Sequence, residues 1–153
     1  MRRVVHYAAP VLLLFAICGT AIAAEKSFEK TVPVPSDRDA ELDWTHEDCV
    51  VESVTLRNFP DEEEIEEARR EDPNDKSWLW WEFNVSNRGN RDCRIWLSVE
   101  VLDAKGRVVK GSDRSGSVSA GELDDDIRVS TLMKTIDAAD APKVRLRARI
   151  GPK

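Results

Sequence analysis

The chain has few of the residues that most often carry catalysis or bind metals. Its 153 residues include three cysteines and two histidines, and no histidine lies in a recognisable catalytic motif. We therefore expect no enzyme activity, no cofactor and no catalytic residues. A positive excess is also missing, because 23 Lys and Arg face 29 Asp and Glu, for a net charge of −6. This balance argues against a nucleic-acid partner.

Long hydrophobic runs are absent outside the N-terminus. Arg2 and Arg3 precede an apolar stretch over residues 8–17, and the small-x-small triplet Ala21–Ala23 follows it. The stretch is too short to cross a bilayer comfortably. This pattern predicts a signal peptide over residues 1–23, cleaved near Ala23. The mature chain would then be exported to a periplasm or the exterior, with no membrane span.

Cleavage would leave one histidine, His46, and two cysteines, Cys49 and Cys93. An even pair of cysteines in an exported chain predicts one disulfide. The short spacing of His46 and Cys49 could also suggest two metal ligands. Structural zinc needs four such ligands, however, and only three Cys and His would remain, so we predict no metal site. Loss of Arg2 and Arg3 would bring the net charge to −8.

Apolar residues alternate with polar ones along most of the chain, which is typical of half-buried strands. Leu79, Trp81, Phe83 and Val85 share one face of the clearest example. The pattern predicts an all-β, immunoglobulin-like antiparallel β-sandwich of about seven strands. We expect an N-terminal edge segment over 24–45 and the sandwich over 46–153, with an acidic helical insertion at 60–75. The expected strands cover 31–34, 50–56, 76–87, 92–103, 107–109, 127–133 and 144–150.

The region from Trp81 to Gly111 contains Phe83–Asn87, the stretch Leu97–Asp103, and Gly106–Val109. It resembles bacterial exported immunoglobulin-like modules of the FxLYD type, although Val101-Leu102 stand where those modules have Leu-Tyr. The resemblance covers about a third of the chain. It implies a β-sandwich used for association or surface display, with no catalytic residues to carry over.

Parity along the strands predicts which aromatic and basic side chains point outward. Trp78 and Trp80 should lie on the outer side of strand 76–87, and Trp96 on that of strand 92–103, which we expect to pair with it as a hairpin. Arg145 and Arg147 alternate outward near the C-terminus. These five residues form the predicted binding face. Alternatively, arginines stack on the indoles within the chain, or the acidic helix folds over this face.

We therefore predict a protein-association module of the bacterial cell envelope, with an unknown envelope protein or a glycan as partner. Trp and Arg dominate interface hot spots, which favours a protein. A carbohydrate-binding module is one alternative, since exposed indoles stack on sugar rings. A calcium-stabilised envelope domain is another, because Asp61–Glu64, Asp72–Asp75 and Asp124–Asp126 are rich in carboxylates.

Overall fold

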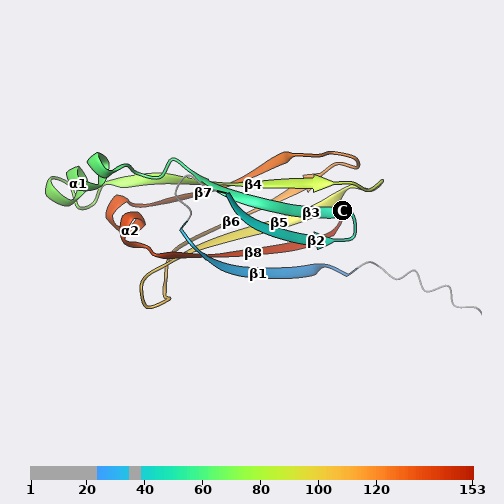
Figure 1. Ribbon diagram of the computed structural model, residues 1–153, viewed down its shortest axis with the longest axis horizontal. Helices are drawn as coiled ribbons and strands as arrows, with labels where there is room; N and C mark the ends of the chain where they lie inside the picture. The colour runs from blue at the N-terminus through green and yellow to red at the C-terminus, as the bar shows by residue number, and fades with distance from the viewer. Residues whose placement is uncertain (1–23, 35–38) are drawn as a thin grey trace, which may run out of the picture.

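The computed structural model describes residues 24–34 and 39–153, which form two four-stranded antiparallel sheets packed together (Figure 1). The predicted signal peptide lies outside these residues. The antiparallel β-sandwich is confirmed, with eight strands instead of about seven. Sheet I has the order β1 (Lys26–Pro33), β8 (Lys143–Pro152), β5 (Cys93–Leu102) and β6 (Val108–Val118). Sheet II has the order β2 (Asp39–His46), β3 (Cys49–Arg57), β4 (Lys76–Asn87) and β7 (Asp125–Lys134).

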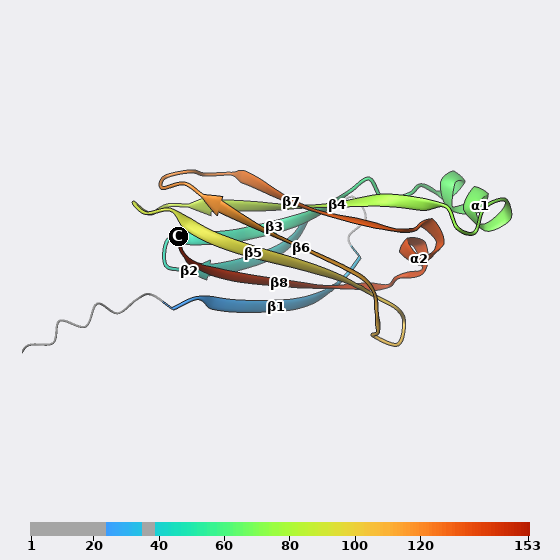
Figure 2. The ribbon, with the colours of Figure 1, turned by 180° about the vertical axis from the view of Figure 1, so that it is seen from behind.

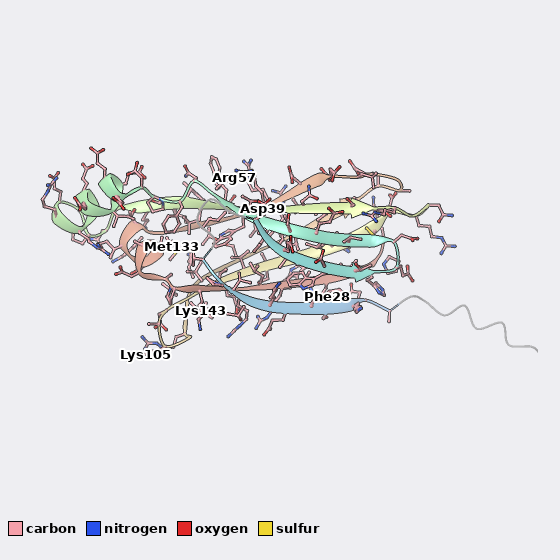
Figure 3. All side chains as sticks on the ribbon, viewed as in Figure 1. Phe28, Asp39, Arg57, Lys105, Met133 and Lys143 are labelled. Atoms are coloured by element: carbon pink, nitrogen blue, oxygen red, sulfur yellow. A yellow bond between two sulfur atoms is a disulfide. The ribbon has the colours of Figure 1, made fainter. Side chains whose placement is uncertain are left out.

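The core lies between the two sheets and is built by the alternation seen in the sequence. Each strand turns every second side chain inward, and these inward positions carry Val, Ile, Leu and aromatic residues. All of the inner positions expected on β4, β5, β7 and β8 are buried, and Trp81 and Phe83 are fully inaccessible to solvent. Met133 lies between the sheets at the end where β7 meets α2 (Thr135–Asp140) (Figure 3).

The predicted hairpin between β4 and β5 is wrong. β4 pairs with β3 and β7, whereas β5 pairs with β6 and β8. The link over 88–92 therefore crosses from sheet II to sheet I. Five residues can span up to about 17 Å, which exceeds the separation of about 10 Å between packed sheets. The crossing allows the apolar inner faces of both strands to contribute to one core.

β6 was predicted far too short, and β2 was not predicted. The inner side of β6 lacks an apolar period, whereas Ala40, Leu42 and Trp44 of β2 do alternate. β2 buries only Leu42 and Trp44, and β6 buries only Val118. β6 is much longer than the predicted strand over 107–109. Residues 26–33 and 39–45 are built into the sandwich, since β1 pairs with β8 and β2 pairs with β3. The expectation that Thr31–Val34 contributes an edge strand is correct, because β1 is the outer strand of sheet I.

Basic side chains bridge the two sheets along both of their open sides. On one side, Lys26 and Lys30 of β1 donate to backbone carbonyls of β2, those of Thr45 at 3.3 Å and Glu41 at 2.6 Å. On the other, Arg114 of β6 donates to the Arg128 carbonyl of β7 at 3.1 Å. Inward charges of this kind satisfy edge carbonyls and hinder edge-to-edge pairing between molecules.

The predicted helical insertion is present as α1 (Glu62–Arg70), and it begins with a capping box. The Asp61 carboxylate accepts from the Glu64 backbone N–H at 2.9 Å, and the Glu64 carboxylate accepts from the Asp61 N–H at 3.0 Å. Acids in the first turn and arginines in the last match the helix dipole. α1 lies beside α2 at one end of the sandwich, as both views show (Figures 1 and 2).

The predicted disulfide between Cys49 and Cys93 is present. Cys49 begins β3 in sheet II and Cys93 begins β5 in sheet I, so the bond joins the two sheets at the end opposite the helices. Both cysteines are buried.

Candidate binding surfaces

The structure separates the five residues of the predicted binding face. Trp78 and Trp80 point outward from β4 in sheet II, whereas Trp96 on β5 and both arginines on β8 point outward from sheet I. The two groups therefore lie on opposite outer faces of the sandwich. The parity prediction holds, and the separation follows from the crossing between β4 and β5. Each face has to be considered by itself.

On sheet I, Trp96 is covered by its own chain. The Arg149 guanidinium lies over the indole, 4.6 Å from the ring centroid, and the indole N–H donates to the Asp113 carboxylate at 3.1 Å. Asp113 belongs to β6, the strand whose length was underestimated from the sequence. This arrangement is the internal cation–π stacking that we gave as an alternative to a binding face.

Arg145 and Arg147 are also engaged within sheet I. Both donate to the Glu100 carboxylate, at 3.0 and 2.9 Å, and Arg147 donates to Glu29 at 2.6 Å. The hydrogen bond from Arg147 lowers the pKa of the Glu29 carboxyl and raises the pKa of Arg147 itself. These guanidinium groups are already paired, so they offer a partner less than unpaired arginines would.

Sheet II repeats the motif around Trp80. The Arg128 guanidinium lies 4.8 Å from the Trp80 ring centroid and also donates to Glu82 at 2.6 Å. Arg57, on the outer side of β3 (Figure 3), donates to the other oxygen of the same carboxylate at 3.2 Å. The hydrogen bond from Arg128, supported by Arg57, lowers the pKa of Glu82 below its ordinary value of 4.5.

The Glu82 ion pairs should make stability depend on pH. A carboxyl whose pKa is lower in the folded state stabilises the fold above the unfolded pKa, and this contribution is lost as pH falls. We expect Glu82→Gln to flatten the decline of the urea midpoint between about pH 5.5 and 3 relative to wild type. Glu41→Gln is the control, since it removes an exposed carboxylate that forms no ion pair with other described residues. Equal flattening in both variants would contradict this assignment.

Trp78 differs from the other outward indoles because it is uncovered. It is 49% exposed, and among the described residues no cation stacks on its ring. Asn58 donates to the Trp78 carbonyl at 2.8 Å, which ties the backbone of β4 to the end of β3. Half-buried Leu132 lies directly opposite on β7. The alternation in β7 predicts that Leu132 points outward. The sequence does not predict that Leu132 pairs with Trp78. Trp78 and Leu132 together are the Trp78 surface.

The end of the sandwich with the disulfide has a cavity of about 590 Å³, lined by His46, Asn90, Arg91 and both cysteines among others. His46 Nε2 is buried, with no hydrogen-bond partner in the described part of the chain. Cys49 is oxidised, so it supplies no thiolate there. Within residues 24–34 and 39–153, no group of three His, Cys, Asp or Glu side chains is placed to hold a metal ion.

The acidic helix α1 does not cover either tryptophan face. α1 lies beyond the end of sheet II, where Arg69 pairs with Asp140 of α2 at 2.7 Å (Figure 1). The interpretation in which this helix folds over a basic, aromatic face is therefore wrong. Among the helices of the described residues, none is long and apolar enough to cross a membrane.

Comparison with known proteins adds no family. No protein-family model matches the chain, and no curated protein matches it. The resemblance to exported immunoglobulin-like modules is thus supported only as a two-sheet β-sandwich.

Proposed function

We propose that this protein is a non-catalytic association module that binds a partner protein through the Trp78 surface. The half-exposed indole of Trp78 carries the proposal. An indole exposed to this degree offers roughly 100 Å² of area, and covering it would contribute about 2.5 kcal/mol to binding. Trp80 and Trp96 offer less, because arginines already stack on them.

The surroundings of Trp78 match the composition of a protein interface. Leu132 extends the apolar area, and the paired charges of Arg57, Glu82 and Arg128 lie farther along the same face. An aromatic residue at the centre, bordered by satisfied polar groups, is the usual arrangement of a hot spot. The tie from Asn58 holds the backbone of Trp78 in place, which lowers the ordering cost of binding.

We place this association in the bacterial cell envelope or the exterior. The disulfide between Cys49 and Cys93 is consistent with export, since such bonds persist in oxidising compartments. The predicted signal peptide and the resemblance to FxLYD-type modules point the same way. Sequencing the N-terminus of the protein purified from its native cells tests the export step. A mature protein that begins near Ala24 is the expected result.

A photo-crosslinking residue at position 78, introduced in the native cells, tests the binding surface. We expect a discrete adduct from position 78 and none from position 123. Leu123 is the matched control because it is 57% exposed and lies between β6 and β7, away from the helices. A second arm places the crosslinker at position 132, where the adduct should disappear when Trp78 is changed to Ala. Equal adducts from positions 78 and 123 would contradict the proposal.

Glycan binding is the alternative that the same face favours. Trp78 and Trp80 are two residues apart on the outer side of β4, and Asn84 follows on the same side. Isothermal titration of the purified protein with envelope polysaccharides distinguishes the two functions. Heat that is released with a glycan and lost in Trp78→Ala would favour a carbohydrate-binding module. No heat with any glycan is the expected result.

A further inference from the structure

The net charge of the chain is concentrated in one short segment. Residues 60–75 contain nine Asp and Glu but only two Arg, a net charge of −7 in a chain whose total is −6. All other residues together are therefore close to neutral. We call residues 60–75 the acidic segment. It includes α1 and the loop that leads into β4.

The acidic segment lies at the same end of the molecule as the Trp78 surface. β4 begins at Lys76, directly after the segment, so Trp78 is three residues or about 10 Å beyond Asp75. Lys76 and Lys134 stand beside this junction, but Asp137 and Asp140 of α2 offset their charge. The nearest carboxylate of the segment, that of Asp75, is therefore about one Debye length from the exposed indole, and the other carboxylates lie farther from it, toward the end of the molecule.

Most of these carboxylates have no partner cation within the described residues. Within the described residues, the ion pairs that involve the acidic segment are those of Arg69 with Asp140 and of Arg70 with Glu71. The acidic side chains of α1 are exposed, whereas Ala68 is buried and Ile65 is half-buried. Five of these carboxylates, from Glu64, Glu67, Glu71, Asp72 and Asp75, line one pocket between the helix and the loop, but within the described residues no three of them are placed to hold a metal ion. Negative charge of this kind on an open surface attracts the Lys and Arg side chains of a cationic partner.

We propose that the partner segment docking on the Trp78 surface is amphipathic and cationic. Its apolar side chains would cover Trp78 and Leu132, while its Lys or Arg side chains would lie against the acidic segment. This inference rests on the proposed function and adds the chemistry of the partner. The apolar contact supplies the anchor, and charge complementarity supplies orientation and a faster association.

The crosslinking experiment at position 78 is extended with two double variants. Glu63→Gln/Glu67→Gln neutralises two exposed positions on one side of α1, and Glu41→Gln/Glu47→Gln neutralises two exposed positions on β2 and the following turn. We expect the α1 variant to lower the adduct yield about fivefold and to reduce its salt dependence. The β2 variant should behave as wild type. Thermal melting of both variants confirms that they are folded.

Mass spectrometry of the adduct identifies the partner's crosslinked peptide and therefore its charge and apolar residues. A crosslinked peptide with net positive charge and flanking apolar residues is the expected result. A neutral or acidic peptide, or a yield unchanged by Glu63→Gln/Glu67→Gln, would overturn the cationic partner and leave protein association intact. If position 78 gives no specific adduct, or one with a glycan, both the proposed function and this inference fail.

Discussion

Replacing both cysteines by serine should lower the free energy of unfolding by about 4 kcal/mol. The disulfide joins residues 44 positions apart, and an open loop of that length gains much conformational entropy in the unfolded chain. Domains of this size have a net stability of about 5–15 kcal/mol, so the loss is a large share of the total. Urea unfolding of wild type and Cys49→Ser/Cys93→Ser measures it.

Reduction of the wild-type protein provides the control for this prediction. With excess thiol, the wild-type midpoint should move to that of the double serine variant, because both then lack the same crosslink. The slope against urea should rise slightly in both, since a chain without the crosslink exposes more surface when unfolded. A midpoint that stays at the oxidised value in Cys49→Ser/Cys93→Ser would show that the core alone holds the two sheets together.

The inner faces of the strands could be predicted from the sequence because burial on one side imposes a strict period of two. Leu79 to Val85 on β4 and Cys93 to Val101 on β5 alternate without interruption, and both sets are buried. β2 was missed although Ala40, Leu42 and Trp44 alternate in it, because that apolar run is only three residues long. β6 places Lys110, Ser112 and Arg114 on the side facing inward, so no apolar pattern marks it.

Strand pairing could not be predicted from the same pattern. The link over 88–92 contains Asn and Gly, which suit a hairpin turn as well as a crossing between sheets. Only the packing of the whole chain decides between them. This single choice separates Trp80 from Trp96, and with them the five residues predicted to form one face. Parity identified the outward residues correctly, but it carries no information about which sheet they belong to.

Whether an arginine stacks on each indole also depends on how the strands pair. Arg149 reaches Trp96 because β8 lies beside β5, and Arg128 reaches Trp80 because β7 lies beside β4. Trp78 has Leu132 opposite it, and no cation among the described residues stacks on it. Trp78 also has no partner on β3, because the pairing of β3 with β4 ends at Arg57 and Trp80. The residues that the neighbouring strands place beside each indole therefore distinguish a stabilising contact from a candidate binding surface.

Trp81 should tolerate Phe far better than Ala. Its side chain is fully buried at the centre of β4 and is the largest fully buried one among the described residues, so Trp81→Ala should cost about 3–5 kcal/mol. The Trp81 indole N–H, however, has no hydrogen-bond partner within the described residues. Leaving such a donor unpaired costs about 1–3 kcal/mol, and Phe removes the donor while it keeps most of the apolar contact.

The two substitutions thus separate packing from polar desolvation at one position. We expect Trp81→Phe to lower the free energy of unfolding by about 1 kcal/mol or less, since the lost volume is offset by loss of the unpaired donor. Phe83→Ala, two residues away on the same inner face, is the control for a cavity with no polar contribution. If Trp81→Phe were as costly as Phe83→Ala, the shape of the indole would outweigh its unpaired N–H. Urea unfolding of the three variants decides between these contributions.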